Sequence, residues 1–402
     1  MVREYKDSGI TWIGSIPKEW KTERIKALFS ERNERDCQGK TLLSVSQYFG
    51  IRPKSETDLA DSHIAESYDD YKEVRKGDFV MNIMLAWNGS YAVSDYDGIV
   101  SPAYCVFKFR KDCCKKYFHY LLRTDGYPSA FKTMSRGVID SRLRLYPEQF
   151  YTFPVIIPSV DEQQRIADYL DKKCAEIDGL IELQEQMIAQ LTDYKQSVIT
   201  EAVTKGINPN AQLVPSGIDR IGDVPEEWKV CQLKRFLLFQ NGQDYKEIEV
   251  KEGDGFPVYG SGGIFTYAER YMYDGESVLF GRKGTVNRPL YVNCKFWTVD
   301  TMYYTIPKKD VNCKFMYYVA TTLPFDKYST STALPSMTQT ILGNLKVAIP
   351  AKDEQSVIVE YLDKKCGEID NLIAVKQQKI ETLKEYKKSI IFECVTGKKE
   401  IN

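Results

Sequence analysis

The chain contains the segment Ile157-Pro158-Ser159-Val160-Asp161-Glu162-Gln163, which returns 192 positions later as Ile349-Pro350-Ala351-Lys352-Asp353-Glu354-Gln355. The match continues from Tyr169-Leu170-Asp171-Lys172-Lys173-Cys174 to Tyr361-Leu362-Asp363-Lys364-Lys365-Cys366. A fixed internal offset indicates that one structural unit is used again. The sequence therefore predicts two equivalent segments, and these segments decide the fold.

A second, shorter repeat precedes each body of the chain. Ser8-Gly9-Ile10 and Ile13-Gly14-Ser15-Ile16-Pro17-Lys18-Glu19-Trp20 return as Ser216-Gly217-Ile218 and Ile221-Gly222-Asp223-Val224-Pro225-Glu226-Glu227-Trp228, at an offset of 208. The order is short repeat, variable body, long repeat, and then the same again. Two halves with a common plan are expected.

Each long repeat is predicted to be a helix. Its apolar positions are spaced alternately by three and four residues, which is the heptad pattern of a coiled coil. The expected start and stop residues are Pro158 and Pro350 before the helix, Asp161 and Asp353 as N-caps, and Gly206 and Gly397 past its end. Roughly forty residues at about 1.5 Å each give a helix on the order of 60 Å long.

The apolar seams of the two helices match each other. A helix with so narrow a seam has little to bury against its own body, although packing there is the simpler alternative. We expect the helices to pair antiparallel within the chain, with Gln184 and Lys376 interrupting the seam and fixing its register. The predicted seam residues are Leu170, Cys174, Ile177, Ile181, Ile188, Leu191, Leu362, Cys366, Ile369, Ile373, Ile380 and Leu383.

The bodies between the repeats have a different character. Residues 21–156 and 229–348 are rich in Tyr, Phe, Val, Thr and Gly, with alternating runs such as Ala103-Tyr104-Cys105-Val106-Phe107-Lys108-Phe109. This favours short strands with a few helices, the clearest at 115–122 and 315–321, and hence an α+β fold class. The expected pseudo-twofold organisation is a first body at 1–156, a long helix at 157–206, a second body at 207–348 and a second long helix at 349–402. Because the bodies share little sequence, each is expected to contact something different.

Composition places the chain among globular proteins. Of its 402 residues 43% are apolar and 28% charged, and no apolar run is long enough to span a membrane. The N-terminus lacks an apolar signal core and the ten cysteines form no CxxC pair, so we expect reduced thiols and a cytoplasmic location. With only His63 and His119 present, neither a zinc site nor a histidine-based catalytic centre is expected.

Charge is balanced overall but unevenly distributed. The chain has 55 Lys and Arg against 56 Asp and Glu. Residues 103–157 hold ten basic and four acidic side chains, and residues 270–346 hold ten and five, whereas 161–201 hold ten acidic and four basic ones. Two basic blocks, one in each body, are thus separated by an acidic helix.

The usual signatures of an active site are missing from the sequence. It contains no GxxxxGK[ST] phosphate loop, no GxSxG elbow and no DPPY or NPPY tetrapeptide of an amino-methyltransferase. Gly260-Ser261-Gly262-Gly263 is predicted to be a loop or hairpin, and Thr396-Gly397-Lys398-Lys399 a helix C-cap. We expect no catalytic residue, metal or cofactor site in this chain.

The basic blocks instead combine Arg and Lys with amides, hydroxyls and aromatic side chains. Arg and Lys suit phosphates and guanine edges, Asn and Gln suit adenine, and Ser and Thr suit either. For any one of these residues a solvated surface charge is the simpler interpretation, but two blocks in matching places favour nucleic-acid binding. The candidates in the first body are Asn82, Trp87, Asn88, Ser101, Tyr104, Lys132, Ser135, Arg136, Ser141, Arg142 and Arg144. In the second body they are Ser261, Arg282, Lys283, Thr285, Asn287, Arg288, Ser331, Thr332, Ser336, Thr338 and Gln339.

Taken together, these segments resemble the specificity (S) subunit of type I restriction-modification systems. The resemblance rests on Trp12-Ile13-Gly14-Ser15-Ile16-Pro17-Lys18-Glu19-Trp20 and its copy, and on the Ile-Pro-x-x-Asp-Glu-Gln that leads into each helix. Body segments such as Val74-Arg75-Lys76-Gly77-Asp78 and Gly98-Ile99-Val100-Ser101-Pro102-Ala103-Tyr104 add to it. It covers nearly the whole chain.

The resemblance implies that each body is a target recognition domain for one half of a bipartite DNA site. The long helices would form an antiparallel coiled coil that sets the spacer, since ~60 Å spans one to two turns of B-DNA at about 34 Å per turn. It also implies that catalysis belongs to partners. These are two methyltransferase subunits with S-adenosylmethionine, acting on adenine N6, and two motor-nuclease subunits with ATP and Mg²⁺. The outer helix faces would bind the methyltransferase subunits, and this chain would be non-catalytic.

Three other interpretations are weighed against this one. A fused enzyme fragment would carry a methyltransferase or nuclease motif, which the sequence lacks. A coiled-coil scaffold that does not bind DNA would show no salt-dependent affinity for a duplex. A specificity subunit of a methylation-only complex would have the same sequence features as the favoured interpretation.

Overall fold

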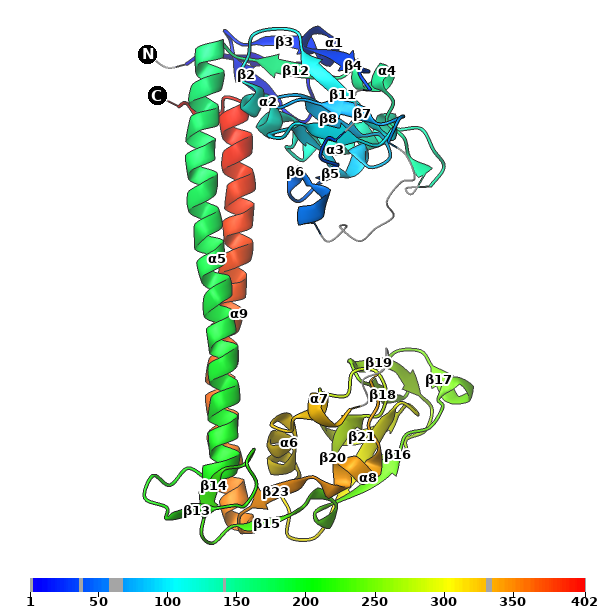
Figure 1. Cartoon of the computed structure of the whole chain (residues 1–402), viewed down its shortest axis with the longest axis vertical. Helices are drawn as coiled ribbons and strands as arrows, with labels where there is room; N and C mark the ends of the chain where they lie inside the picture. Colours follow the sequence, from blue (N-terminus) through cyan, green and yellow to red (C-terminus); the bar gives the residue numbers. More distant parts are fainter. Residues whose placement is uncertain (1–2, 36–38, 58–67, 140–141, 330–334, 402) are drawn as a thin grey trace. The chain divides into compact units, whose positions relative to one another are not determined.

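The computed structural model describes residues 3–35, 39–57, 68–139, 142–329 and 335–401, and divides into two units (Figure 1). Unit 1 comprises residues 1–183 and 379–402, and unit 2 comprises residues 184–378. The long helices α5 (Val160–Lys205) and α9 (Lys352–Val395) each contribute to both units. Unit 1 therefore contains the start of α5 and the end of α9, and unit 2 contains the reverse. Among the described helices, none has the length and hydropathy of a membrane span.

The body of unit 1 is built on a four-stranded antiparallel sheet in the order β4-β11-β8-β9. These strands are β4 (Phe29–Arg32), β11 (Tyr104–Phe109), β8 (Phe79–Asn82) and β9 (Tyr91–Val93). Antiparallel pairs surround it: β1 (Tyr5–Asp7) with β2 (Ser15–Pro17), β3 (Lys21–Arg24) with β12 (Pro154–Ile157), β5 (Leu43–Ser46) with β6 (Gly50–Pro53), and β7 (Lys72–Val74) with β10 (Gly98–Val100). Its short helices are α1 (Ile25–Leu28), η1 (Lys54–Glu56), η2 (Ala86–Asn88), α2 (Lys115–Leu122), α3 (Gly126–Met134) and α4 (Pro147–Phe150).

The body of unit 2 has a seven-stranded sheet in the order β16-β22-β20-β21-β18-β19-β17. Its strands are β16 (Leu237–Asn241), β22 (Met302–Pro307), β20 (Tyr273–Gly281), β21 (Leu290–Thr298), β18 (Phe256–Gly260), β19 (Gly263–Ala268) and β17 (Glu249–Val250). Two antiparallel pairs flank it, β13 (Leu213–Pro215) with β14 (Asp223–Pro225) and β15 (Lys229–Gln232) with β23 (Lys346–Ile349). Its short helices are η4 (Leu233–Arg235), η5 (Lys246–Ile248), α6 (Cys313–Thr321), α7 (Phe325–Tyr328) and α8 (Gln339–Asn344).

The two bodies share one topology although they share little sequence. The four sheet strands of unit 1 are, in chain order, β4, β8, β9 and β11, and the equivalent four in unit 2 are β16, β20, β21 and β22. In each set of four the first strand pairs with the fourth, the fourth with the second, and the second with the third. Unit 2 extends this sheet by β18, β19 and β17, with β18 joining β21 in parallel. The predicted mixture of strands and helices is thus present in both units, and α2 and α6 occupy the predicted helical segments.

The long repeats are helical, but the predicted N-caps are wrong. Helix α5 begins at Val160, so Asp161 lies inside its first turn. There its negative charge interacts favourably with the positive end of the helix dipole. The Ser159 hydroxyl accepts the Glu162 N–H at 3.3 Å and caps this end. The predicted C-caps are confirmed, because Gly206 and Gly397 follow the helices with φ of 75° and 72°, a left-handed conformation that favours glycine.

The two long helices contact each other within each unit. In unit 1, Lys387 Nζ lies 2.6 Å from an Asp178 carboxylate oxygen, and in unit 2, Lys195 Nζ lies 2.7 Å from Asp370. The offset of 192 relates Asp178 to Asp370 and Lys195 to Lys387, so the repeat produces the same interhelical ion pair twice. All twelve predicted seam residues are buried or half-buried. Gln184 is buried, and Lys376 Nζ lies 3.2 Å from Met187 Sδ.

The repeated Glu-Gln of the long segment ties each body to the start of its helix. In unit 1, Trp20 Nε1 donates to Glu162 at 2.8 Å, and buried Gln163 donates to Pro158 O at 2.9 Å and accepts the Cys114 N–H at 3.0 Å. Unit 2 repeats these bonds with other residues. Trp228 donates to Glu354, and Gln355 bonds Pro350 O and the Asn312 N–H. The motif is therefore an anchor between segments that are distant in sequence.

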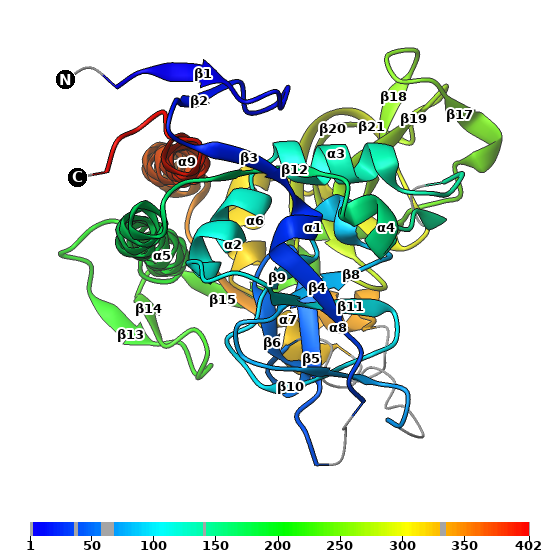
Figure 2. The same cartoon turned by 90° about the horizontal axis from the view of Figure 1, so that it is seen from above.

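A second anchor joins the short helix of each body to its long helix. Asp171 of α5 accepts hydrogen bonds from Tyr120 and Lys116 of α2, which lies beside α5 in both views (Figures 1 and 2). In unit 2, Asp363 of α9 accepts from Tyr318 and Lys314 of α6, at 2.6 Å each. This match is not apparent in the sequence repeat, because the two tyrosines and the two lysines lie at an offset of 198 rather than 192.

Candidate nucleic-acid interface

The candidate residues of unit 1 gather around the end of strand β8. Ile83, which follows β8, donates its N–H to Ala103 O at 3.1 Å and accepts the Leu145 N–H at 2.9 Å. These two bonds bring together three parts of the chain that are far apart in sequence: residues 82–88, residues 101–104, and the described residues 135–139 and 142–145. The structure thus places Ser101, Tyr104 and the arginine-rich loop beside the Asn82–Asn88 segment.

Helix η2 and helix α3 form one part of this surface. Trp87 of η2 is half-buried and donates Nε1 to Met84 O at 3.0 Å, which fixes its ring. The exposed Lys132 of α3 places its ammonium 5.1 Å from the centre of that ring. A cation held over an aromatic face has a defined position, because the ring quadrupole attracts it. Lys132 therefore presents an ordered positive charge at the surface.

The arginine-rich segment forms a loop closed by its own backbone. Arg136 and Arg144 pair as an isolated antiparallel bridge, with both N–H···O distances 2.9 Å. Arg136 and Arg142 are exposed, Ser135 and Arg144 are half-buried, and Arg144 Nη1 donates to Leu143 O. The guanidinium groups of Arg136 and Arg142 are therefore available at the surface of unit 1.

Two of the candidate amides are already used by the protein. Asn82 is buried, and its Oδ1 accepts the Met84 N–H at 3.0 Å. Asn88 Oδ1 accepts both the N–H and the hydroxyl of Ser90. Tyr104 interacts with Asn82, and burial raises the pKa of its hydroxyl. These side chains hold the surface in shape through bonds that the sequence pattern did not reveal.

The β5–β6 turn, which was not among the segments predicted from the sequence, also belongs to this surface. Arg123 donates to Gly89 O and Tyr91 O, the latter at 2.7 Å, and also to Gln47 O, so it fastens the β5–β6 turn beside η2. Burial lowers the pKa of Arg123. Tyr48, at the tip of this turn, is 86% exposed. The turn Gln47-Tyr48-Phe49 carries no charge that would mark it in the sequence, and only the contact of Arg123 with Gln47 O places Tyr48 at this surface.

The candidate residues of unit 2 meet at the equivalent place. Arg282 follows strand β20, donates its N–H to Thr301 O at 2.8 Å and accepts the Met337 N–H at 3.0 Å. Lys283 and Ser336 form an isolated bridge. These bonds repeat those of Ile83 with Ala103 and Leu145, so the same framework holds different side chains in the two units.

Several side chains project from this framework in unit 2. Lys283, Thr285, Asn287, Arg288 and Thr338 are exposed, and Arg282 is half-buried with Nη1 donating to Asp300 O. Thr338 caps α8 by accepting the Ile341 N–H, and Gln339 donates to the Asn241 side chain at 3.0 Å. Ser261 lies on a separate hairpin, in the predicted turn between β18 and β19. Ser141, Ser331 and Thr332 lie outside the described residues.

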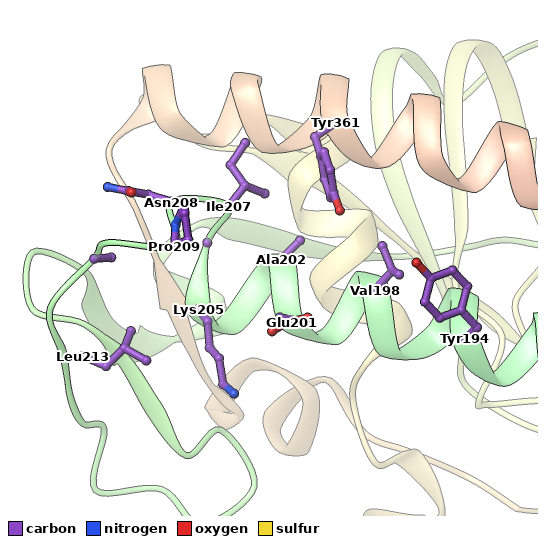
Figure 3. Close-up of a pocket in the computed structure, with 12 residues that line it drawn as sticks. Tyr194, Val198, Glu201, Ala202, Lys205, Ile207, Asn208, Pro209, Leu213 and Tyr361 are labelled. Atoms are coloured by element: carbon purple, nitrogen blue, oxygen red, sulfur yellow. The ribbon is translucent and has the colours of Figure 1, made fainter.

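A pocket of about 490 Å³ lies in unit 2 where α5 ends (Figure 3). Its walls come from the last turns of α5, from the linker that follows and from Tyr361 of α9, and its charged lining residues are Glu201 and Lys205. Within the described ranges, no group of three His, Cys, Asp or Glu side chains could hold a metal ion. The nine cysteines that the structure describes are free thiols.

Residues 17–193 and 225–385 match the family model of the type I restriction modification DNA specificity domain. Among curated proteins, the chain is 22% identical to the "Type I restriction enzyme MjaVIII specificity subunit" of Methanocaldococcus jannaschii, over 95% of this chain and 93% of that one. It is 25% identical to the "Putative type I restriction enzyme MjaX specificity subunit" of the same organism, over 99% and 98%.

Solved structures share the fold. One is a chain from a study of complex assembly and conformational transition of the type I R-M system, with a TM-score of 0.72, 17% identity and coverage of 95% of this chain and 99% of that one. Another is the HsdS subunit from Thermoanaerobacter tengcongensis, with a TM-score of 0.52, 17% identity and coverage of 95% and 98%.

Proposed function

The chain belongs to the type I restriction-modification DNA specificity family and is a specificity subunit with two recognition domains, and from this premise we propose how it works. Each unit reads one half of a bipartite duplex site, with unit 1 using the surface around Ile83 and unit 2 the surface around Arg282. The repeated framework carries this proposal, because it presents unlike side chains from the same backbone positions. Unlike side chains on one framework read unlike half-sites.

Some of the proposed contacts position the protein on the DNA backbone, and others recognise the bases. The exposed Arg136, Arg142, Lys283 and Arg288 suit phosphates or guanine edges, and Thr285 and Asn287 can bond bases. We assign reading to the major groove, where all four base pairs can be distinguished. The near-neutral total charge is compatible with this role, since acidic side chains elsewhere in the chain balance the basic groups of these two surfaces.

The long helices are proposed to pair as an antiparallel coiled coil that sets the spacer between the half-sites. This is supported by the buried or half-buried positions of all the seam residues and by the interhelical ion pair that occurs in each unit. A helix of 46 residues at about 1.5 Å each is roughly 70 Å long, about two turns of B-DNA.

Two methyltransferase subunits are proposed to dock on the outer faces of the helices. Leu180 and Leu183 of α5 are exposed in unit 1, and Leu372 and Val375, their counterparts at the offset of 192, are exposed in unit 2. The recurrence of exposed apolar side chains at equivalent positions of both long helices supports a partner that binds each helix in the same way. Two equivalent patches, one in each unit, support two copies of one partner.

Catalysis is assigned to the partners, and this chain is proposed to be non-catalytic and cytoplasmic. The methyltransferase subunits would bind S-adenosylmethionine and methylate adenine N6, and two motor-nuclease subunits would use ATP and Mg²⁺. The target adenine would be flipped out of the helix by the methyltransferase subunit, which needs to reach its N6 atom.

A base-resolution methylation map of the host genome, with and without this gene, tests the proposal. We expect one bipartite adenine-methylated motif to disappear with the gene. Its two halves would give the half-sites, and its gap would give the spacer. An unchanged map in cells that express the partner subunits would contradict the proposal.

A further inference from the structure

Arg123, at the end of α2, joins two segments of the unit 1 surface that lie far apart in sequence. Its guanidinium donates to Tyr91 O at 2.7 Å, to Gly89 O at 3.3 Å and to Gln47 O. Gly89 follows η2, and Gln47 begins the three-residue turn Gln47-Tyr48-Phe49 between β5 and β6. A Cβ added at Gly89 would lie 3.7 Å from Gln47 Cβ, so the turn touches the end of η2. Because a guanidinium is planar and rigid, these bonds fix the turn relative to η2.

Holding α2 in place does not explain the presence of this arginine. The anchors of α2 to α5 and of α6 to α9 are the same at an offset of 198, and Thr124 and Thr322 also correspond, since each donates to the backbone three residues earlier at 2.8 Å. The residue that corresponds to Arg123 is Thr321, whose hydroxyl donates to Tyr318 O of its own helix. Unit 2 therefore builds the same helix end without an arginine.

The charge of Arg123 is not balanced by an acidic side chain. Among the described residues no carboxylate forms an ion pair with it, and its bonds go to three carbonyl oxygens. Burial lowers the pKa of Arg123, because the carbonyl groups restore only part of the solvation that the cation loses. Unit 1 thus carries an energetic cost that unit 2 avoids, and the structural result of this cost is a fixed turn beside η2.

The turn that Arg123 fixes carries side chains that suit DNA. The half-buried Gln47 has an amide that can bond adenine in the major groove, and the exposed Tyr48 has a hydroxyl that can bond a base edge or a phosphate. Arg52 lies 5.7 Å from the centre of the Phe49 ring, just as Lys132 lies over the ring on η2. Each of the two joined segments therefore holds an ordered cation that suits a phosphate.

We propose that the turn Gln47-Tyr48-Phe49 reads base pairs in the half-site that unit 1 recognises, and that Arg123 is the residue that positions this turn. The inference rests on the proposed function and adds specificity-determining residues to it. Arg123 acts through the backbone of the turn and does not itself contact DNA. Because Arg123 and the turn both belong to unit 1, their effect is confined to one half-site.

The test uses the assembled complex with its methyltransferase subunits, and duplexes in which each base pair of its own methylated motif is changed singly. Arg123→Lys keeps the charge, but one ammonium nitrogen cannot occupy the positions of both Nη1 and Nη2. We expect the dissociation constants to show about 10-fold less discrimination at one or more base pairs of a single half-site. The other half-site and the salt dependence should stay unchanged, because no phosphate contact is lost.

Gln47 and Tyr48 replaced together by Ala remove side chains of the turn itself and should reduce discrimination at the same base pairs. Adding Arg123→Lys to this variant should cause little further loss, because changes that act through the same contact are not additive. Arg110→Lys is the matched control. Arg110 Nε also donates to a backbone carbonyl of unit 1, Phe29 O at 2.8 Å, but it lies at the opposite end of β11 from Tyr104. Its complex should discriminate like the native one.

Unchanged discrimination in the Arg123→Lys complex would overturn the inference, and so would equal losses in both half-sites. If Arg123→Lys prevents folding, the Gln47 and Tyr48 variant decides alone, because unchanged discrimination there contradicts the inference equally. In all these cases the native complex keeps its preferred site. Failure of the proposed function itself would appear differently, as a native complex with no preferred site.

Discussion

A buried ion pair in unit 1 shows how a single residue supports the fold. Arg32 of β4 and Asp78 before β8 are 9% and 6% exposed at their side chains, and Nε lies 2.8 Å from Oδ2. Replacing Asp78 by Ala removes the buried carboxylate and leaves the buried guanidinium with only the half-exposed Glu34 as an acidic partner, at 2.8 Å from Nη1. We expect the free energy of unfolding of unit 1 to fall by about 3–5 kcal/mol in denaturant titrations.

The exposed pair between Arg35 and Asp70 serves as the control for this prediction. Asp70→Ala should cost less than about 1 kcal/mol, since exposed ion pairs contribute little. Equal losses in the two variants would contradict the importance of burial. The Arg32–Asp78 pair could not be predicted from the sequence, because 46 residues separate its members and neither lies in a repeated pattern.

The stability of unit 1 should depend on the protonation of His119. Burial, followed by the neighbouring Arg123 guanidinium, lowers the pKa of His119 to about 3, and Nδ1 accepts the Val93 N–H at 3.3 Å. Because the unfolded chain binds this proton near pH 6.5 and the folded chain does not, stability is lost as the pH falls from about 6.5 towards 3. The slope from this group is at most about 1.4 kcal/mol per pH unit.

His119→Asn removes the titrating ring and keeps an acceptor near Nδ1. Urea unfolding of unit 1 at several pH values should therefore show a shallower dependence in the variant than in the native protein. Parallel curves for the two proteins would show that His119 is not the titrating group. The comparison between variant and native protein removes the contribution of the carboxylates, which titrate in both.

At the scale of elements, the repeated Gln163 and Gln355 make a paired prediction possible. Gln163→Leu leaves the Cys114 N–H and Pro158 O without their buried partner, at about 1–3 kcal/mol for each group. Amide hydrogen exchange should accelerate at the start of α2 in this variant. Gln355→Leu should do the same at the start of α6 and leave α2 protected, because its partner there is the Asn312 N–H.

Gln164→Leu is the control for both variants. Gln164 is exposed and bonds only Asp168 of its own helix among the contacts described, so exchange in α2 should stay unchanged. Accelerated exchange in both units after either single change would contradict the local role of each anchor. The motif was recognisable in the sequence, but its partners lie 49 and 43 residues away, and no local pattern marks them.

The pairs of exposed apolar residues on α5 and α9 allow the number of bound methyltransferase subunits to be tested. Leu180 and Leu183 replaced together by Ser should weaken binding of one methyltransferase subunit by roughly 10- to 100-fold, from loss of about 1–3 kcal/mol of apolar burial. Native mass spectrometry at limiting concentration should then show one bound copy in place of two.

Replacing Leu372 and Val375 by Ser should remove the other copy, and the four-residue variant should bind neither. A complex that keeps both copies in every variant would place the docking surface elsewhere. The sequence predicted that the outer faces bind partners but not which residues do so. Which residues are exposed depends on how each helix is rotated about its axis. The heptad pattern identifies the exposed positions only to within a few residues.

For the whole molecule, the two recognition surfaces should fail independently. Replacing Arg136, Arg142 and Arg144 together by Ala should weaken binding both to the intact site and to duplexes in which the second half-site has been altered. The variant should still prefer the intact second half-site to an altered one. Arg282, Lys283 and Arg288 replaced by Ala should show the reverse. The slope of log K against log salt should fall in magnitude by about 0.9 for each phosphate contact removed.

Equal loss of discrimination at both half-sites after either triple change would contradict this modular organisation. The sequence predicted the repeated helices, their seam and the two basic blocks, since all of these are periodic or compositional. It did not reveal that the bodies share a strand order, because their shared backbone bonds at Ile83 and Arg282 involve unlike residues. Tyr48 could not be predicted either, because an isolated exposed side chain is part of no periodic or compositional pattern.

The completion of unit 1 by the end of α9 has a consequence for biosynthesis. Ile390, Cys394 and Val395 are part of its core, and the Tyr117 hydroxyl donates to Val395 O across 278 positions of the chain. When the ribosome has translated residue 183, the core of unit 1 therefore still lacks the residues of α9 that complete it. Unit 2, in contrast, is one continuous segment of the chain. Bringing α9 back to the body of unit 1 closes a long loop, which costs more conformational entropy than forming contacts between residues close in sequence. The part of the polypeptide that is translated first is the part that finishes folding last.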